Sequence, residues 1–223
     1  MVKKTWCISE LTDEFIERMN RILELYERPY NPKEPVICFD EKSKQLLADP
    51  RTPLPMKPGM PKRIDSEYIR NGTANIFVMV EPKAGIRYTI VRKRRKKEDF
   101  SFCIERLVDI YKVNKVHKIH IVMDNLNTHS EKSLVDTFGK KKAEKIMKNV
   151  LFHYTPKHGS WLNMAEIEIG VMESQCLKRR IPDIDTMEKE LSAWQNARNE
   201  RRAKINWRFT REKASEKFKL NSK

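Results

Sequence analysis

Two short runs of apolar, strand-forming residues, each followed directly by an aspartate, constrain the fold most strongly. VICFD covers residues 36–40 and KIHIVMD covers residues 118–124. Runs this short and this rich in β-branched residues are typical of buried strands and not of helices. An acidic residue at the end of such a strand lies where the sheet emerges from the core, so Asp40 and Asp124 would share one cleft if the two strands are neighbours.

Helical and strand patterns alternate through the rest of the chain. Apolar residues at helical spacing predict helices over 12–26, 98–111 and 140–148, and through most of the chain after residue 161. Strand-forming runs predict further strands within 74–82, 85–93 and 150–154. Antiparallel strands early in the chain and helix-separated strands later imply an α/β fold, with a mixed sheet covered by helices on both faces.

Turns and caps are predicted between these elements. Gly85 closes a predicted hairpin turn, where glycine is free to adopt a positive φ. Thr12 is the expected N-cap of the first helix, and Thr128 stands three residues before Glu131, which is capping-box spacing. The Pro-rich segment 48–62 has no periodicity and is expected to be an irregular excursion over the surface.

The charge of the chain points to a polyanionic partner. The 223 residues include 46 basic and 31 acidic side chains, which gives a formal net charge of +15. Neutralising phosphates with such an excess releases condensed counterions, so nucleic acid is the first candidate. A membrane surface is less favoured, because no predicted helix combines a basic face with a strongly apolar one.

The sequence shows neither a membrane span nor a secretory signal. No apolar run approaches the ~20 residues needed to cross a bilayer, and the N-terminal stretch MVKKTWCISELTDEF lacks the apolar core of a signal peptide. A cytoplasmic protein is therefore expected. Because Cys7, Cys38, Cys103 and Cys176 are widely spaced, with no CxxC pair, we expect reduced thiols and no zinc site.

A third carboxylate comes from the segment YTPKHGSWLNMAEIEIG, residues 154–170. On a helix, Asn163, Glu166 and Glu173 share one face, whereas Glu168 points about 200° away from Glu166. Only one of the two neighbouring glutamates can therefore face a cleft. The spacing alone also allows both to form a solvated edge near a helix N-terminus, where negative charge is favourable.

Three carboxylates in one cleft would repel one another and raise their pKa values. A divalent cation removes this conflict, and Mg²⁺ or Mn²⁺ is the natural partner because hard ions take oxygen ligands. Two such ions would activate the attacking oxygen and stabilise the leaving oxygen during displacement at phosphorus. If they converge, Asp40, Asp124 and Glu166 are the predicted metal ligands of a site that cleaves phosphodiesters. The alternative is that each aspartate is only a turn former or a helix cap.

Several segments, taken in order, resemble one family. The chain contains VICFDEKSKQLL, EYIRNGTANIF, IVMDNLNTH, HYTPKHGSWLNMAEIE, RRIPD and AWQNARN. These segments are similar to the bacterial insertion-sequence 630 transposases, mariner-like relatives in the DDE superfamily, and the resemblance extends from about Lys4 to Phe218. It implies a ribonuclease H-like fold in which Asp40, Asp124 and Glu166 are catalytic. It also implies that Glu166 is buried among apolar neighbours while presenting one metal ligand.

The resemblance implies a transposase activity. Such enzymes cut the ends of a DNA element by magnesium-dependent hydrolysis and join the freed 3′-hydroxyl to double-stranded target DNA, characteristically at TA dinucleotides. A homodimer is expected, because two ends must be held in one synaptic complex. In a bacterial cell the protein would be nucleoid-associated when bound to DNA.

The resemblance also divides the chain into parts. Residues 1–33 are expected to be a helical lead-in, 34–181 the catalytic domain, and 182–223 a C-terminal helical extension. Family members usually carry N-terminal helix-turn-helix modules, and little sequence precedes the catalytic region here. The chain is then a fragment, a split-frame product or a remnant, and an upstream helix-turn-helix polypeptide would be its partner.

Other residues near the three carboxylates are candidates for supporting roles or for contact with DNA. The supporting candidates are Asn125, Asn127, His129, His158 and Asn163. The candidates for DNA contact are Arg92, Lys93, Arg94, Arg95, Lys96, Lys97, Lys157 and Trp161. Turn or capping roles explain the first three supporting residues equally well. The basic run 92–97 is as readily a solvated hairpin end, and Trp161 is more simply a core residue.

Two other functions share the predicted site. A ribonuclease H-like nuclease that does not join strands would have the same fold and carboxylates, since a fold does not fix a function. A catalytically inactive DNA-binding remnant is the other alternative. An aspartyl phosphatase of the haloacid-dehalogenase type is excluded, because it requires a second aspartate two residues after the first and Lys42 stands there.

Overall fold

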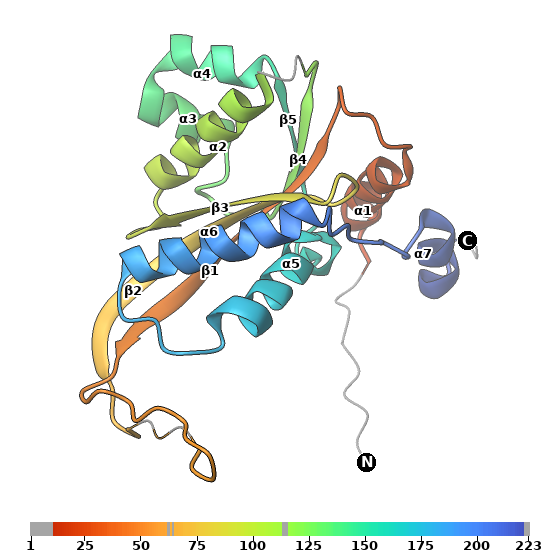
Figure 1. Cartoon of the computed structure of the whole chain (residues 1–223). Helices are drawn as coiled ribbons and strands as arrows, with labels where there is room; N and C mark the ends of the chain where they lie inside the picture. Colours follow the sequence, from red (N-terminus) through yellow and green to blue (C-terminus); the bar gives the residue numbers. More distant parts are fainter. Residues whose placement is uncertain (1–10, 62, 64, 113–115, 221–223) are drawn as a thin grey trace.

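A mixed five-stranded sheet forms the centre of the computed structural model, which describes residues 11–61, 63, 65–112 and 116–220. The strands are β1 (Val36–Ala48), β2 (Ile69–Glu81), β3 (Ile86–Arg92), β4 (Ile119–Met123) and β5 (Val150–Tyr154). Their order across the sheet is β3-β2-β1-β4-β5 (Figure 1). The first three strands pair antiparallel, whereas β1, β4 and β5 pair parallel, which confirms the predicted mixed sheet.

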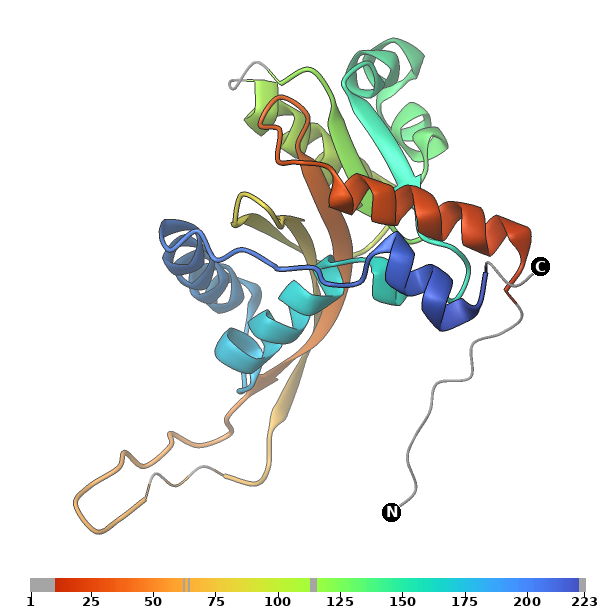
Figure 2. The same ribbon diagram turned by 90° about the vertical axis from the view of Figure 1, so that its right-hand side faces the viewer.

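Helices cover both faces of this sheet, as predicted. The helices are α1 (Asp13–Glu27), α2 (Lys97–Lys112), α3 (Glu131–Phe138), α4 (Lys140–Met147), α5 (Ala165–Met172), α6 (Ile184–Glu200) and α7 (Arg211–Phe218). A 3₁₀ turn (Ser160–Leu162) precedes α5, and a π-helical turn (Glu173–Leu177) follows it. Helices α2, α3 and α4 pack on one face, and α1, α5, α6 and α7 pack on the other (Figures 1 and 2).

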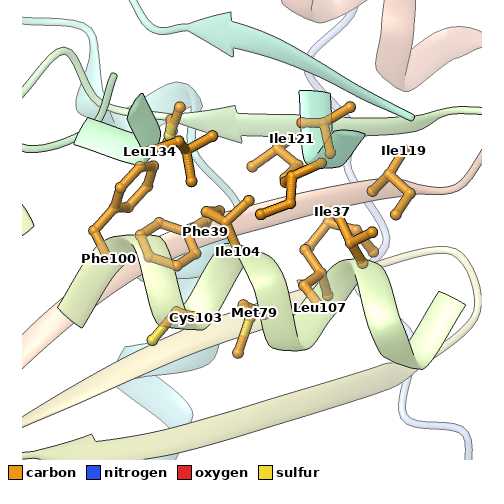
Figure 3. Close-up of a cluster of buried hydrophobic side chains, with 14 of the residues drawn as sticks. Ile37, Phe39, Met79, Phe100, Cys103, Ile104, Leu107, Ile119, Ile121 and Leu134 are labelled. Carbon is orange, nitrogen blue, oxygen red and sulfur yellow. The ribbon is translucent and has the colours of Figure 1, made fainter. Parts of the chain in front are cut away.

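Alternation along β1 determines which residues face which helices. Ile37 and Phe39 belong to the buried cluster beneath α2, which Figure 3 shows in close-up. Cys38 lies between them in sequence and packs in the cluster formed by α1 and α5. Because successive side chains of a strand point to opposite faces, Asp40 is on the same face as Cys38. The first predicted catalytic aspartate therefore faces the α5 layer.

The first strand is longer than predicted. The sequence suggests a strand that ends at Asp40, but β1 continues to Ala48 and pairs with β2 along most of this length. The second half carries polar residues such as Lys42 and Gln45, which removes the apolar signal although the backbone ladder continues. Beyond it, the Pro-rich residues 49–61 are irregular, as predicted, but they project away from the helices and do not lie over the surface, so that part of the prediction is wrong (Figures 1 and 2).

One of the two predicted helix caps is correct. The Thr12 hydroxyl accepts a hydrogen bond from the Phe15 N–H at 3.2 Å, as expected of an N-cap. The prediction for Thr128 is wrong, because Ser130 is the N-cap of α3. The His129 N–H donates to the Leu126 carbonyl at 2.9 Å, and this turn carries the loop past Thr128 before the helix begins.

The structure describes three of the four cysteines and most of the residues that a membrane-spanning helix could occupy. Cys38, Cys103 and Cys176 are free and buried, whereas Cys7 lies outside the described residues. Burial raises the pKa of the Cys38 and Cys103 thiols to about 12, so these groups stay protonated. Among the described residues, no helix is long and apolar enough to cross a membrane.

Gly85→Ala is expected to destabilise the fold by more than an ordinary turn substitution. Gly85 has φ +70°, and an added Cβ would lie 2.4 Å from the backbone carbonyl of Arg202. Gly72, at φ +85°, has no atom within 4 Å of the same position. The left-handed conformation alone costs about 1–2 kcal/mol in a non-glycine residue, so Gly72→Ala measures that cost without the overlap. Urea unfolding should show the larger loss for Gly85→Ala, and equal losses would contradict this reading.

Candidate active site

Two predicted catalytic aspartates lie side by side where β4 leaves the sheet. In the parallel β1–β4 ladder, Cys38 pairs with Val122. Asp40 and Asp124 stand two residues further along each chain, and Asp124 is the first residue after β4. Cys38 and Val122 both pack in the cluster that includes Ala165 of α5, so the face that carries Asp40 is the face that α5 covers.

Asn163 holds the start of α5 against β1. Its Nδ2 donates to the Phe39 carbonyl at 2.8 Å, and its Oδ1 accepts from the Ala165 N–H at 3.1 Å. Phe39 directly precedes Asp40, and Ala165 directly precedes Glu166. A single buried amide therefore links the backbone beside one predicted catalytic residue to the backbone beside another, which agrees with the supporting role predicted for Asn163.

The side chain of Glu166 is exposed, so the prediction that it is buried among apolar neighbours is wrong. The buried glutamate of this helix is Glu168, which is 0% exposed and receives a hydrogen bond from Arg87. The alternative prediction, that both glutamates form a solvated edge, is wrong for Glu168 because this side chain is buried. A separation of two residues turns the helix by about 200°, which directs Glu168 to the interior and Glu166 outward.

Asp124 and Glu166 influence Asp40 electrostatically. Burial and, after it, the negative charges of Asp124 and Glu166 raise the pKa of Asp40 to about 7. The Glu41 N–H, which donates to Asp40 Oδ1 at 2.7 Å, and the nearby His129 act in the opposite direction. A carboxyl with this pKa is held close to other negative groups in a partly desolvated place.

His129 contacts Asp124 from beneath the loop that follows β4. Its Nδ1 lies 2.6 Å from Asp124 Oδ1, and the ring is 1% exposed. The ring also packs edge-on against Phe39 and in a tilted stack against Phe100. Because an ionised carboxylate only accepts hydrogen bonds, Nδ1 is the protonated nitrogen in this contact. The packed ring thus fixes the direction of one Asp124 oxygen.

A comparison with known families identifies the family of the chain. A model described as "DDE superfamily endonuclease" matches residues 35–188, a range that contains Asp40, Asp124 and Glu166. The chain belongs to this family. No curated protein matches the sequence.

Solved transposase structures share the fold of this DDE endonuclease. The Mos1 mariner paired-end complex with Mn has a TM-score of 0.58 at 16% identity, over 91% of this chain and 61% of that chain. The Mos1 strand transfer complex gives a TM-score of 0.59 at 17% identity, over 91% and 60%. The paired-end complex with Mg gives 0.57 at 17% identity, over 88% and 59%. This chain therefore spans about 60% of those chains, and the predicted ribonuclease H-like fold is confirmed.

The donor atoms of the site suit a hard divalent ion. Asp40, Asp124 and Glu166 offer oxygen atoms, the ligands that Mg²⁺ and Mn²⁺ prefer, and a cation would offset the repulsion that raises the Asp40 pKa. In the described part of the chain, no three His, Cys, Asp or Glu side chains converge as a metal-binding group. Asp40 and Asp124 instead accept hydrogen bonds from Glu41 and His129.

The other predicted supporting residues lie in the two loops beside the carboxylates. Asn125 and Asn127 follow Asp124 and are exposed. Lys157 and His158 are exposed in the loop before α5, where His158 adopts a φ of 63°. Trp161 is half-buried and packs against Phe209, with ring centroids 5.4 Å apart. The core role is therefore the better description of Trp161.

The basic run 92–97 connects β3 to α2 and passes close to the site. Arg92 pairs with Asp99 at 3.0 Å, and Lys97 pairs with Asp136 at 3.0 Å. Lys93, Arg94, Arg95 and Lys96 are exposed. A groove opens between this run and the loop that follows Asp124, and its lining includes Arg95, Lys96, Lys97, Asn127, Thr128 and Lys132.

Glu41 is a residue of the site that the sequence analysis did not single out. It follows Asp40 on β1, so its side chain points to the opposite face. Its Oε1 lies 3.5 Å from Arg95 Nη1. Burial raises the pKa of Glu41, whereas the charges of His129 and Arg95 lower it. The sequence could have indicated this role, because Glu41 directly follows Asp40 in CFDEK and neighbouring residues of a strand point to opposite faces.

Asp40→Asn is expected to stabilise the metal-free protein, and more strongly at pH 8 than at pH 5. The Asp40 pKa is raised from 3.8 to about 7 in the fold. Below the unfolded pKa the carboxyl is protonated in both states and costs no stability. As the pH rises towards 7, the unfolded chain loses this proton while the fold retains it, so the fold loses stability. Each pKa unit corresponds to about 1.4 kcal/mol, so the gain should reach a few kcal/mol. Urea unfolding in the presence of a chelator at both pH values measures it.

The exposed Asp185 of α6 supplies a matched control. Asp185→Asn removes the same charge away from the site, and we expect no pH-dependent gain from it. Adding Mn²⁺ should raise the melting temperature of the parent protein more than that of Asp40→Asn. A gain from Asp40→Asn that is equal at both pH values would contradict the electrostatic account.

Proposed function

We propose that the chain is the catalytic part of a transposase of the bacterial insertion-sequence 630 type. The observation that carries this proposal is the arrangement of Asp40, Asp124 and Glu166. They come from two paired strands and a packed helix and lie within the matched DDE endonuclease region, and the charges of Asp124 and Glu166 add to the effect of burial in raising the pKa of Asp40. Asp40, Asp124 and Glu166 are the proposed metal ligands.

Each proposed role follows from the contacts of the side chain. Bound Mg²⁺ or Mn²⁺, which we propose as two ions, would supply the positive charge that activates the attacking oxygen and stabilises the leaving oxygen. His129 holds one oxygen of Asp124 in a fixed direction. Asn163 holds the first turn of α5, which carries Glu166, against β1. The exposed Asn125 and Asn127 stand where a DNA strand would pass.

The basic groove beside Asp124 is the proposed path of the DNA backbone. Its basic residues are Arg95, Lys96 and Lys97 on one side and Lys132 on the other, and Glu98 and Asp136 also line it. Cationic side chains of this kind position a nucleic acid through its phosphates and carry no sequence information. The Oε1 of Glu41 lies 3.5 Å from Nη1 of Arg95, which lines this groove.

The proposed reaction has two steps. Water first cleaves the phosphodiester at an element end, and the freed 3′-hydroxyl then attacks target DNA at a TA dinucleotide. Two ends would be joined in a homodimer, with an upstream helix-turn-helix polypeptide that recognises the ends. We propose a cytoplasmic, nucleoid-associated protein in a bacterial cell.

A nuclease that does not join strands and an inactive DNA-binding remnant are the alternatives. Both would keep the basic groove. The remnant is less favoured, because a carboxylate cluster with a raised Asp40 pKa costs stability and has no use in a protein that only binds DNA.

Asp124→Asn and Glu166→Gln are each expected to abolish metal-dependent cleavage of transposon-end DNA. Each change removes a proposed ligand charge while it keeps the size of the side chain. Gel analysis of labelled DNA with Mg²⁺ or Mn²⁺ measures cleavage, and precleaved ends with target DNA measure joining. Glu212→Gln on α7 is the control and should retain activity.

The joining assay separates the three functions. Joined products that need Asp124 and Glu166 support the transposase. Cleavage without any joining would favour the nuclease, and DNA binding that is indifferent to metal and to both substitutions would favour the remnant.

Replacing Arg95, Lys96 and Lys132, which are exposed and line the groove, together by Ala is expected to weaken DNA binding and to reduce its salt dependence. Three phosphate contacts correspond to a change of about 3 in the slope of log K against log salt concentration. Fluorescence anisotropy across a salt series measures it. The control replaces Lys140, Lys141 and Lys145 of α4, which are exposed lysines outside the groove. An equal effect of both triple substitutions would refute a specific path through the groove.

A further inference from the structure

We infer that Glu168 is a positioning residue of the proposed metal site. Together with Arg87 and Arg198, it fixes the rotation of α5 so that Glu166 faces Asp40. This inference rests on the proposed function, because it concerns the geometry of the same three carboxylates. None of the three network residues is itself a proposed metal ligand.

Glu168 is the acceptor at the centre of a buried network. Its Oε1 accepts from Arg87 Nε at 3.0 Å and from Arg198 Nε at 2.8 Å, and its Oε2 accepts from Arg198 Nη2 at 3.2 Å. The side chains of Glu168 and Arg87 are both 0% exposed, and that of Arg198 is 19% exposed. The carboxylate is therefore held from two sides by fork-shaped donors, which restrict its direction as well as its distance.

Arg87 extends the network into the backbone of two other elements. Its Nη1 donates to the Gly85 carbonyl at 2.9 Å and to Asn199 Oδ1 at 3.1 Å. Its Nη2 donates to the Ala203 carbonyl at 2.5 Å. The β2–β3 turn and the end of α6 thus share one guanidinium, and Figure 1 shows α6 running beside β3 and α5. The network anchors α5 to the β2–β3 turn and to the end of α6.

The anchor matters because α5 is short. The helix has eight residues, and the side chain at its start is Asn163, whose Oδ1 accepts from the Ala165 N–H at 3.1 Å. Glu166 and Glu168 point in nearly opposite directions on it. Any rotation of the helix that displaces Glu168 from its two arginines also displaces Glu166 from Asp40. Asn163 fixes the start of α5, and the Glu168 network fixes its rotation.

The charged nature of the network supports a role in geometry more than in stability. The attraction within a buried ion pair barely offsets the free energy of hydration that both groups lose. Apolar residues of similar size therefore often give equal stability. They do not give the directional contacts that two guanidinium groups make with one carboxylate. Arg198 is also placed by Trp194, over which its guanidinium stacks at 5.5 Å.

The test is Mn²⁺ binding by Glu168→Gln, measured without any reaction. Free Mn²⁺ counted by electron paramagnetic resonance gives the affinity, and circular dichroism gives the melting temperature. We expect an affinity loss of about 10-fold or more, the range found when residues that orient metal ligands are changed. Arg198→Lys, which keeps the charge, should lose less affinity than Arg198→Met, which does not.

Leu107→Ala separates positioning from a loss of stability. Leu107 is a fully buried residue of α2 on the opposite face of the sheet. It should lower the melting temperature and leave Mn²⁺ affinity within about twofold. If Glu168→Gln fails to fold, Arg198→Met at the edge of the network carries the test. The inference is overturned if the folded network variants bind Mn²⁺ with an affinity within twofold of the parent. It is also overturned if Leu107→Ala loses as much Mn²⁺ affinity as the network variants do.

The failure of the inference is distinguishable from failure of the proposed function. Suppose that the parent binds Mn²⁺, that Asp124→Asn loses this binding and that the network variants retain it. This result overturns only the positioning role of Glu168. Absence of Mn²⁺ binding by the parent, or binding that Asp124→Asn leaves unchanged, overturns both.

Discussion

The parallel pairing of β1 with β4 is the constraint on which the candidate site depends. Pairing reaches Cys38 and Val122, after which β4 ends while β1 continues along β2. The chain after Met123 therefore leaves the sheet beside Asp40, and Asp124 is carried to the same edge. A shift of one residue in this register would turn the side chains of β4 to the other face, and the two aspartates would no longer share a layer with α5.

That register also imposes an electrostatic cost, which the core beneath it must offset. Burial and neighbouring carboxylates raise the Asp40 pKa to about 7, so the ionised site is less stable than an uncharged one. Phe39 and Phe77 are 0% exposed and Phe100 is 1% exposed. Each fully buried aromatic or large aliphatic side chain contributes about 1.5–3 kcal/mol. A few such residues are enough to hold charges that repel one another in place.

The sequence predicted those features that depend on neighbouring residues. Alternation and helical spacing identified the strands and helices, because apolar faces repeat along each element. The polar half of β1 was missed, since its signal is a backbone ladder with β2 and not an apolar run. Thr128 was predicted as the cap of α3, but Ser130 caps it because the chain makes a turn at His129 first. Such a turn is set by what packs beneath it, which spacing does not record.

Glu166 and Glu168 show most clearly where sequence reasoning ends. Helical geometry establishes that the two side chains oppose each other, but it gives no indication of which one is buried. The answer lies in Arg87, 81 residues away, and Arg198, 30 residues away, which together provide a buried carboxylate with donors. A glutamate in an apolar motif is thus buried or exposed according to its distant partners. The apolar neighbours of Glu166 suggested burial, whereas the arginines assign that place to Glu168 and leave Glu166 accessible to a metal ion.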